Sequence, residues 1–308
     1  MSTATERADS GVPASPLRLS FREWLDVLKR AGRQFLDDDC MGLAQQVAYS
    51  SLLAFLPSII LLIGLLGLFG NGAFDSLERF VGSVAPHGVI KMIDLARKDA
   101  AGNKSGSAIA FAVGTAGAVW AASGAMGSVI KAVNRAYDRV ETRPFWKVRL
   151  IAILLVVATG LAIAGVFLLI VFGGDLGNAI VRRTGLGGTF KVFWNIARLP
   201  IAFVAVLLFF ALVYYLAPDT KERNWRWISP GSLVGSLLWL LLSGLFAVYT
   251  SFAGSYSRTY GSIAGAIILL LWLNYSAWAI LFGAELNSEL ERQADIHAAG
   301  GPRVASSP

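Results

Sequence analysis

The residues of this chain that combine polar chemistry with regular spacing lie in its last long apolar segment, residues 260–291. Asn274, Trp278 and Glu285 recur there at helical spacing, and Leu281 completes the same stripe. No residue from 263 to 284 carries a formal charge, so the segment is long enough to cross a hydrocarbon core of about 30 Å. Because a polar stripe on such a helix avoids lipid, we expect it to face other helices or a water-filled cavity.

Two interpretations of Glu285, the acid that closes this apolar run, stay open. In the first, the carboxylate lies at a hydrated edge, or pairs with Arg135 or Arg139, which we expect on the same side of the membrane. In the second, it binds a substrate or a proton, since an ionisable residue in a span is a functional candidate. Asn287 follows Glu285 and belongs to the same end of the segment.

Other polar and motif residues lie within or at the ends of apolar segments. Pro57 lies in the middle of the first segment, where a proline removes a backbone hydrogen bond and kinks the helix. The kink and the polar first half of that segment suggest that it lines an interior; alternatively, its small polar residues bond only to neighbouring helices. The whole candidate cluster is Tyr49, Pro57, Asn134, Tyr137, Tyr260, Gly261, Asn274, Glu285 and Asn287.

The sequence offers little for catalysis or metal binding. The two histidines, His87 and His297, fall on opposite predicted sides of the membrane, and no zinc-protease, phosphate-loop or nucleophile-elbow motif occurs. The single cysteine, Cys40, permits neither an intrachain disulfide nor a cysteine metal site. The acidic run 37–39 is interpreted as a solvated helix boundary rather than an ion site. We therefore expect no enzyme activity, no cofactor and no metal.

The amino-acid composition indicates the class of protein to which these residues belong. Of 308 residues, 55% are hydrophobic and 15% charged, and the mean hydropathy is +0.59, which is typical of a polytopic membrane protein. The net charge of +7 is scattered among short connections. That pattern fits topology signals rather than nucleic-acid binding.

The predicted fold is an all-α membrane bundle with about six spans plus amphipathic interfacial helices. The expected spans are about 44–69, 107–130, 150–172, 200–216, 228–249 and 260–291. The domain prediction is a disordered cytoplasmic tail over 1–20, a single membrane domain over 21–292 and a loose tail over 293–308. Pro230 is expected in the first turn of the fifth span, where its missing N–H costs nothing.

Three segments qualify this outline. Residues 21–36 have an apolar face and basic flanks, which predicts an amphipathic helix at an anionic membrane surface or, alternatively, a helix packed on the end of the bundle. Residues 70–106 suggest a membrane-adjacent helical hairpin. Small residues recur every four positions from Ala110 to Ala122, so we expect the second span to pack closely, either within one chain or across a homo-oligomer.

Charge predicts the orientation. Six spans place both termini on one side, and more of the 27 Lys and Arg residues fall on that side than on the other. Because positive charge accumulates on the cytoplasmic side, both termini are predicted to be cytoplasmic.

Several ordered motifs carry a resemblance to a known family. AYSSLLAFLPSIILLIG (48–64), VNRAY (133–137), WISPGSLVGSLLW (227–239) and the ends of the last span, YGSIAG and GAELN, occur in this order. Over residues 21–292 the chain resembles the YihY/BrkB inner-membrane family, also called virulence factor BrkB and, by an older transfer, ribonuclease BN. The resemblance implies six spans in a bacterial inner membrane with cytoplasmic termini.

The resemblance supplies neither a substrate nor catalytic residues. Three functions follow as hypotheses: a transporter or exporter for a lipid or another amphipathic or small solute, a non-transporting scaffold or envelope-integrity factor, and the inherited nuclease. We favour the first. The expected partners are membrane lipids and a solute, with no nucleic acid.

Overall fold

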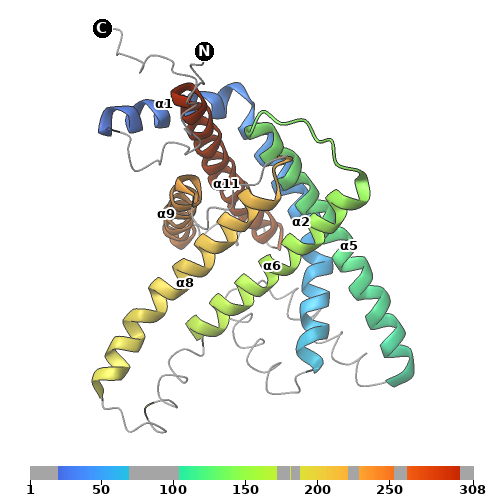
Figure 1. The fold of residues 1–308 in the computed structure, drawn as a ribbon. Helices are drawn as coiled ribbons and strands as arrows, with labels where there is room; N and C mark the ends of the chain where they lie inside the picture. The colour runs from blue at the N-terminus through green and yellow to red at the C-terminus, as the bar shows by residue number, and fades with distance from the viewer. Residues whose placement is uncertain are drawn as a thin grey trace, which may run out of the picture.

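The computed structural model describes residues 20–68, 104–171, 181, 188–220, 229–252 and 262–298, and nearly all of them are α-helical. The helices are α1 (Phe21–Asp37), α2 (Cys40–Leu68), α5 (Lys104–Ala136), α6 (Phe145–Val171), α8 (Gly188–Leu216), α9 (Pro230–Phe252) and α11 (Ser262–Ala298) (Figure 1). No strand occurs in these ranges. The predicted all-α bundle is confirmed.

Five helices of the described residues are long and apolar enough to cross a membrane. Their spans are Gly114–Ala136, Phe145–Val166, Val192–Leu216, Pro230–Ser251 and Ala264–Ala294. The first expected span coincides with α2, a helix of 29 residues that contains Pro57. The expected hairpin over 70–106 lies almost entirely outside the described residues.

The six long helices contact one another in a closed order. α2 packs on α5, α5 on α6, α6 on α8, α8 on α9, α9 on α11, and α11 returns to α2. α11 also contacts α5 across this ring. The ring therefore brings the first and last long helices side by side.

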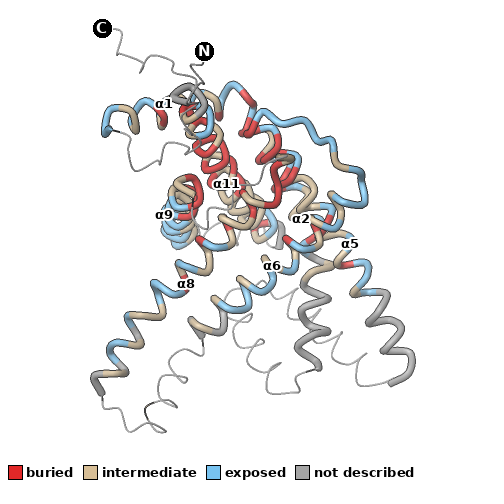
Figure 2. Tube along the Cα trace, in the orientation of Figure 1, coloured by how far each residue is buried: buried red, intermediate tan, exposed pale blue. Residues whose placement is uncertain are grey.

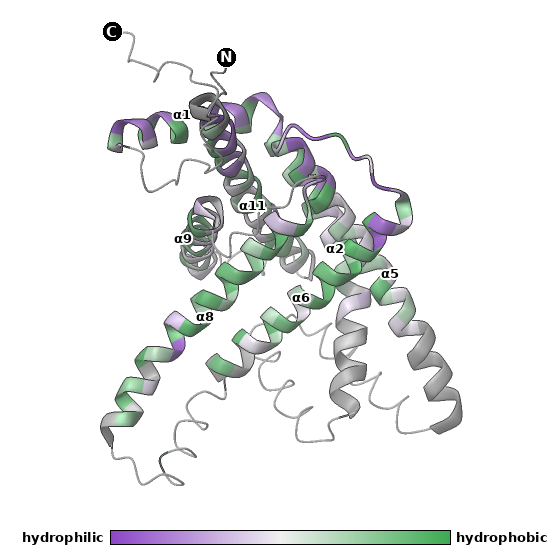
Figure 3. Ribbon diagram, viewed as in Figure 1, coloured by the Kyte–Doolittle hydropathy of each residue, from purple (hydrophilic) through white to green (hydrophobic). Residues whose placement is uncertain are grey.

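Burial is unequal along the bundle. Buried residues gather where the end of α11 meets the starts of α2 and α9 and the ends of α5 and α8, while the far parts of α6 and α8 are largely exposed (Figure 2). The closely packed end is also where hydrophilic residues concentrate, whereas α6 and α8 are hydrophobic along most of their length (Figure 3). The packed end is therefore the one that polar side chains can cross-link.

Helix α1 packs on this end of the bundle. Its start is stabilised by a capping box, in which Ser20 Oγ accepts from the Glu23 N–H and Glu23 accepts from the Ser20 N–H. Val27 and Ala31 are fully buried against Leu286 of α11. This face of α1 therefore fits the alternative of a helix packed on the end of the bundle. Another side of α1 is apolar and exposed, and Phe21 on it is 77% exposed.

Several helices extend beyond their predicted bounds, and α8 and α11 are two clear cases. α8 begins at Gly188, so Pro200 lies inside it rather than at its start. Apolar residues at 190, 192, 193 and 196 continue the helical pattern upstream, and an internal proline is tolerated in membrane helices. α11 continues to Ala298, and Gln293, which we placed in the loose tail, is buried.

The closest helix approach is not on the predicted small-residue stripe. A Cβ built at Gly114 or Gly117 of α5 would meet nothing within 4 Å. A Cβ at Gly231 of α9 would overlap the carbonyl oxygen of Gly283 on α11. α5 nevertheless contacts three other helices, α2, α6 and α11. Oligomerisation stays a prediction.

Candidate functional site

The polar stripe of α11 is the part of the site that protein contacts leave incomplete. Asn274 Oδ1, Trp278 Nε1 and Glu285 Oε2 are buried and have no hydrogen-bond partner among the described residues. These are the three polar members of the stripe expected from spacing alone. α11 turns the opposite face toward α9, since Trp272 and Ser276 bond there to Ser243 and Trp239.

Glu285 is the acid of the stripe, and its side chain is fully buried. Its residue is 0% exposed, and its Oε1 accepts a hydrogen bond from the Cys40 thiol of α2 at 3.3 Å. No cation forms an ion pair with it among the described residues. Glu285 therefore carries one satisfied and one unsatisfied carboxyl oxygen.

Glu285 does not pair with Arg135 or Arg139, which one of the two open interpretations had allowed. Arg135 pairs with Asp38 at 2.8 Å, and Arg139 lies 4.0 Å from Glu291. Asp38 lies at the corner between α1 and α2, and its carboxylate is the one that pairs with Arg135. The carboxylate that Arg135 meets comes from the N-terminal part of the chain, which spacing within α11 does not reveal.

The acidic run before α2 is not simply a solvated boundary. Asp38 is only 6% exposed and also accepts from Gln34. Asp39 has a φ of 50°, and its Oδ1 accepts from the Gly42 N–H at 3.3 Å, which caps α2. Asp37 and Asp39 are exposed and match the solvated interpretation, whereas Asp38 does not.

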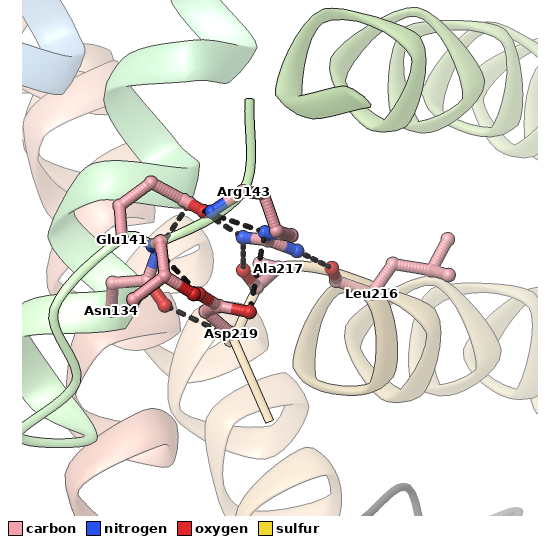
Figure 4. A network of polar contacts seen from close by, with 7 residues as sticks. Asn134, Glu141, Arg143, Leu216, Ala217 and Asp219 are labelled. Carbon is pink, nitrogen blue, oxygen red and sulfur yellow. Dashed lines mark hydrogen bonds and ion pairs between the residues drawn. The ribbon is translucent and has the colours of Figure 1, made fainter. Parts of the chain in front are cut away.

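Asn134 is the centre of a separate network that ties α5 to the end of α8 (Figure 4). Its Nδ2 donates to Glu141 at 2.8 Å, and its Oδ1 accepts from the Asp219 backbone N–H at 2.7 Å. Arg143 donates to Glu141 at 2.6 Å and to the carbonyl oxygens of Leu216 and Ala217. The guanidinium thereby satisfies carbonyls that the end of α8 leaves free.

Charge holds this network ionised. The hydrogen bond from Arg143 lowers the pKa of the Glu141 carboxyl, and the hydrogen bond from Thr142 lowers that of Asp219. The same Glu141 contact raises the pKa of the Arg143 guanidinium. All three groups are therefore more firmly charged than they would be in water.

Asn287 ties α11 to the start of α9. Its Oδ1 accepts from the Gly231 N–H at 2.8 Å, and its Nδ2 donates to Ser229 Oγ at 2.9 Å. Tyr137, the residue after the end of α5, is buried and lies near the same side chain. Pro230 is the first residue of α9, as predicted, so Asn287 serves one of the helix's remaining free N–H groups.

The other candidates do not join these groups. Tyr49 is 61% exposed on α2. Near Pro57, Ser58 Oγ donates to the Ala54 carbonyl oxygen at 2.7 Å within the same helix. Tyr260 and Gly261 lie outside the described residues.

The candidate cluster therefore divides into two kinds of residue. Asn134 and Asn287 make hydrogen bonds that join distant segments and Tyr137 is buried, whereas Asn274 and Glu285 retain unpartnered atoms. Sequence reasoning missed Cys40 as the partner of Glu285, and it missed Arg143. The sequence could have indicated Arg143, because Glu141 and Arg143 lie two residues apart in a short polar connection between two spans.

Within the described ranges, no group of three or more His, Cys, Asp or Glu side chains is arranged to hold a metal ion. The α11 stripe offers hydrogen-bonding groups and one buried acid, Glu285.

Long apolar helices, buried polar contacts between them and an incompletely satisfied stripe define a multi-pass helical membrane protein. More narrowly, the chain belongs to the family described as Virulence factor BrkB, whose model matches residues 31–307. The family resemblance drawn from the motifs is confirmed.

Relatives agree with this assignment. A protein of Bacillus subtilis (strain 168) named "Putative ribonuclease-like protein YfkH" is 31% identical over 251 residues, 80% of this chain and 89% of that protein. A "UPF0761 membrane protein" of Stenotrophomonas maltophilia (strain K279a) is 26% identical over 269 residues, 83% of this chain. The match spans 59% of the Stenotrophomonas protein's length. No solved structure matches the chain.

Proposed function

We propose that this protein moves a lipid, another amphipathic molecule or a small solute across the bacterial inner membrane, along a path lined by the α11 stripe. The observation that carries the proposal is the set of buried atoms on Asn274, Trp278 and Glu285 without partners in the described part of the chain.

The free-energy cost of burying polar atoms without hydrogen-bond partners is the reason why these three atoms suggest a solute. A buried donor or acceptor without a partner costs about 1–3 kcal/mol, and folded proteins satisfy the large majority of such groups. Three of them on one face of one helix indicate that the face has another partner during function. A solute with hydrogen-bonding groups, or water that accompanies it, supplies donors and acceptors to all three.

The unequal packing of the bundle supports the same proposal. Polar contacts cross-link the end where α1 meets α11, through Arg30–Glu289 at 2.8 Å and the Asn134 network. Among the residues whose burial is described, the far parts of α6, α8 and α9 bury far fewer side chains. A bundle whose polar cross-links gather at one end suits a protein that opens toward the other.

Orientation and energy source complete the proposal. Both termini are cytoplasmic, which places the cross-linked end toward the cytoplasm. Because the sequence contains no phosphate-loop motif, movement is driven by an ion gradient, a partner protein or the solute's own gradient.

The experiment is exchange in liposomes that contain purified protein and a fluorescent lipid. Wild-type protein is expected to speed leaflet exchange, and Glu285→Gln and Asn274→Leu are expected to slow it about tenfold. Thr250→Ala, which removes an exposed hydroxyl from α9, is the matched control. The lipid version fails if wild-type vesicles exchange no faster than protein-free ones, and counterflow of small solutes then tests the remaining substrates.

A structural role is the second candidate, because Asn134 and Asn287 make hydrogen bonds that join distant segments of the bundle. On this alternative, the protein is a scaffold or envelope-integrity factor. A deletion strain distinguishes the two. Full complementation by Glu285→Gln and Asn274→Leu, together with failure of Asn287→Ala, favours the scaffold.

We propose no catalytic chemistry for this chain. The ribonuclease-like wording belongs to the name of the Bacillus relative, and the two histidines here are separated by most of the chain. RNA cleavage that copurifies equally with wild type and with charge-neutralised variants would identify a contaminant. Cleavage that is lost with a single carboxylate would contradict the proposal.

A further inference from the structure

Arg149, one turn into α6, holds its guanidinium in a fixed position against α5. Its Cζ lies 3.8 Å from the centroid of the Trp120 ring, and its Nη2 donates to the Trp120 carbonyl oxygen at 2.9 Å. Stacking on the ring and one hydrogen bond together define both the place and the plane of the group.

The charge of Arg149 has no counter-charge within the described chain. Neither α5 nor α6 contains an aspartate or a glutamate, and Arg149 Nε is buried without a partner. By contrast, Arg135 and Arg143 pair with carboxylates at 2.8 and 2.6 Å. An arginine near an apolar helix surface without an anion is costly, so an anion from outside the chain is expected to complete the site.

Exposed aromatic side chains surround Arg149. Trp120 is 62% exposed, and Phe145 and Trp146, one turn before Arg149, are 72% and 63% exposed. Exposed aromatic side chains of this kind mark the headgroup level of a bilayer. Gly124 lies beside the guanidinium, because a Cβ built there would be 3.9 Å from Arg149 Nη1 and no other atom would come closer.

We propose that Arg149 and Trp120 form a binding site for the phosphate of an anionic phospholipid headgroup. The guanidinium has five N–H donors, of which Trp120 takes one, and the Nη1 pair faces the open side of Gly124. A phosphate fits this planar fork in a bidentate manner. Acyl chains would lie along the exposed apolar face of α6, where Leu150 and Leu154 are 58% and 51% exposed. The site is independent of whether the protein transports anything.

Native mass spectrometry of the full chain in detergent tests the site, with phosphatidylglycerol as the lipid probe. Arg149→Gln is expected to weaken binding of the most tightly held lipid roughly tenfold or more, the scale of a lost charge-assisted pair. Arg149→Lys, which keeps the charge but loses the planar fork, is expected to fall between wild type and Arg149→Gln. Lys147→Gln, which removes an equal charge from another face of α6, is the matched control.

Two further measurements keep the proposal falsifiable. If Arg149→Gln does not yield a monodisperse protein, Gly124→Leu closes the approach while Arg149 remains, and it is expected to weaken lipid binding similarly. Millimolar inorganic phosphate, added as a competitor, separates a lipid from a free anion. Equal lipid binding by wild type and the variants overturns the proposal. Displacement of the lipid by inorganic phosphate alone overturns its assignment to a lipid.

Discussion

The side-chain amide of Asn287 on α11 accepts a hydrogen bond from the backbone N–H of Gly231 at 2.8 Å, across 56 residues of sequence. At the same place, a Cβ on Gly283 would come 2.6 Å from the Gly231 carbonyl oxygen. Two motif segments that are distant in the sequence therefore meet at one contact. The contact joins the start of α9 to α11, close to the buried Glu285.

Enlarging the glycines at this contact is expected to destabilise the protein. Gly231→Ala and Gly283→Ala each force α9 away from α11, at a cost of roughly 1–3 kcal/mol typical of overpacking. The measurement is the thermal unfolding midpoint in detergent. Gly114→Ala is the control, because its Cβ meets nothing within 4 Å and alanine favours a helix by about 1 kcal/mol over glycine. A Gly231→Ala midpoint at or above that of the control would contradict the packing.

Removing the Asn287 amide is expected to lower stability by about 1–2 kcal/mol, since the Gly231 N–H at the start of α9 loses its acceptor. Asn287→Asp keeps an acceptor oxygen at that position and is expected to lose less than Asn287→Ala. Unfolding midpoints of the two variants and the wild type provide the comparison. If Asn287→Ala and Asn287→Asp lower the midpoint equally, then the hydrogen bond that Asn287 donates to Ser229 Oγ contributes more to stability than the one it accepts from Gly231.

The Asn134 network is expected to make stability depend on acid pH. The pKa values of Glu141 and Asp219 are lowered in the folded protein, so the unfolded chain takes up protons first as the pH falls. Their stabilising contribution is fully present above their unfolded pKa values near 4 and is lost as the pH drops through the folded values below that. The unfolding midpoint should therefore change little above about pH 5 and decline below about pH 4.

Asp219→Asn tests the origin of that decline. The variant removes one of the two titrating carboxyls, so its midpoint should be lower at neutral pH and fall less steeply in acid. Asp37→Asn, at an exposed position of α1, is the control and should follow the wild-type curve. Identical acid profiles for wild type and Asp219→Asn would show that other groups cause the decline.

Glu285→Gln is expected to separate function from folding. Glutamine keeps an acceptor for the Cys40 thiol and removes only the ionisable oxygen, so membrane insertion and the unfolding midpoint should stay near wild type. Cellular function, scored by complementation of a deletion strain, should be lost. Glu291→Gln changes an acid on the same helix that is 55% exposed at the side chain, and it should complement fully. Full complementation by both variants would show that the Glu285 carboxylate is not needed for function.

Much of this protein is determined by local sequence alone. The all-helical membrane fold, the approximate spans and the α11 stripe follow from hydropathy and from the 3.6-residue period, because both act between neighbours along the chain. The stripe is the clearest case. Its three polar residues were predicted from spacing, and they are the residues of α11 that carry buried atoms without hydrogen-bond partners among the described residues. Helix ends were less accurate, as α8 shows, because apolar residues on both sides of Pro200 continue the same pattern.

Only the tertiary structure decided which polar residues are satisfied. Glu285 meets Cys40 across 245 residues and Asn134 meets Asp219 across 85, and nothing in the spacing of either residue reveals these partners. Asp38 reaches Arg135 because the α1–α2 corner turns it inward. A hydrogen bond or ion pair depends on the position of two groups in space, whereas a helical pattern depends on one segment alone. For that reason the sequence was sufficient to place Glu285 on a polar face, and the packing of α2 against α11 was needed to show what that face lacks.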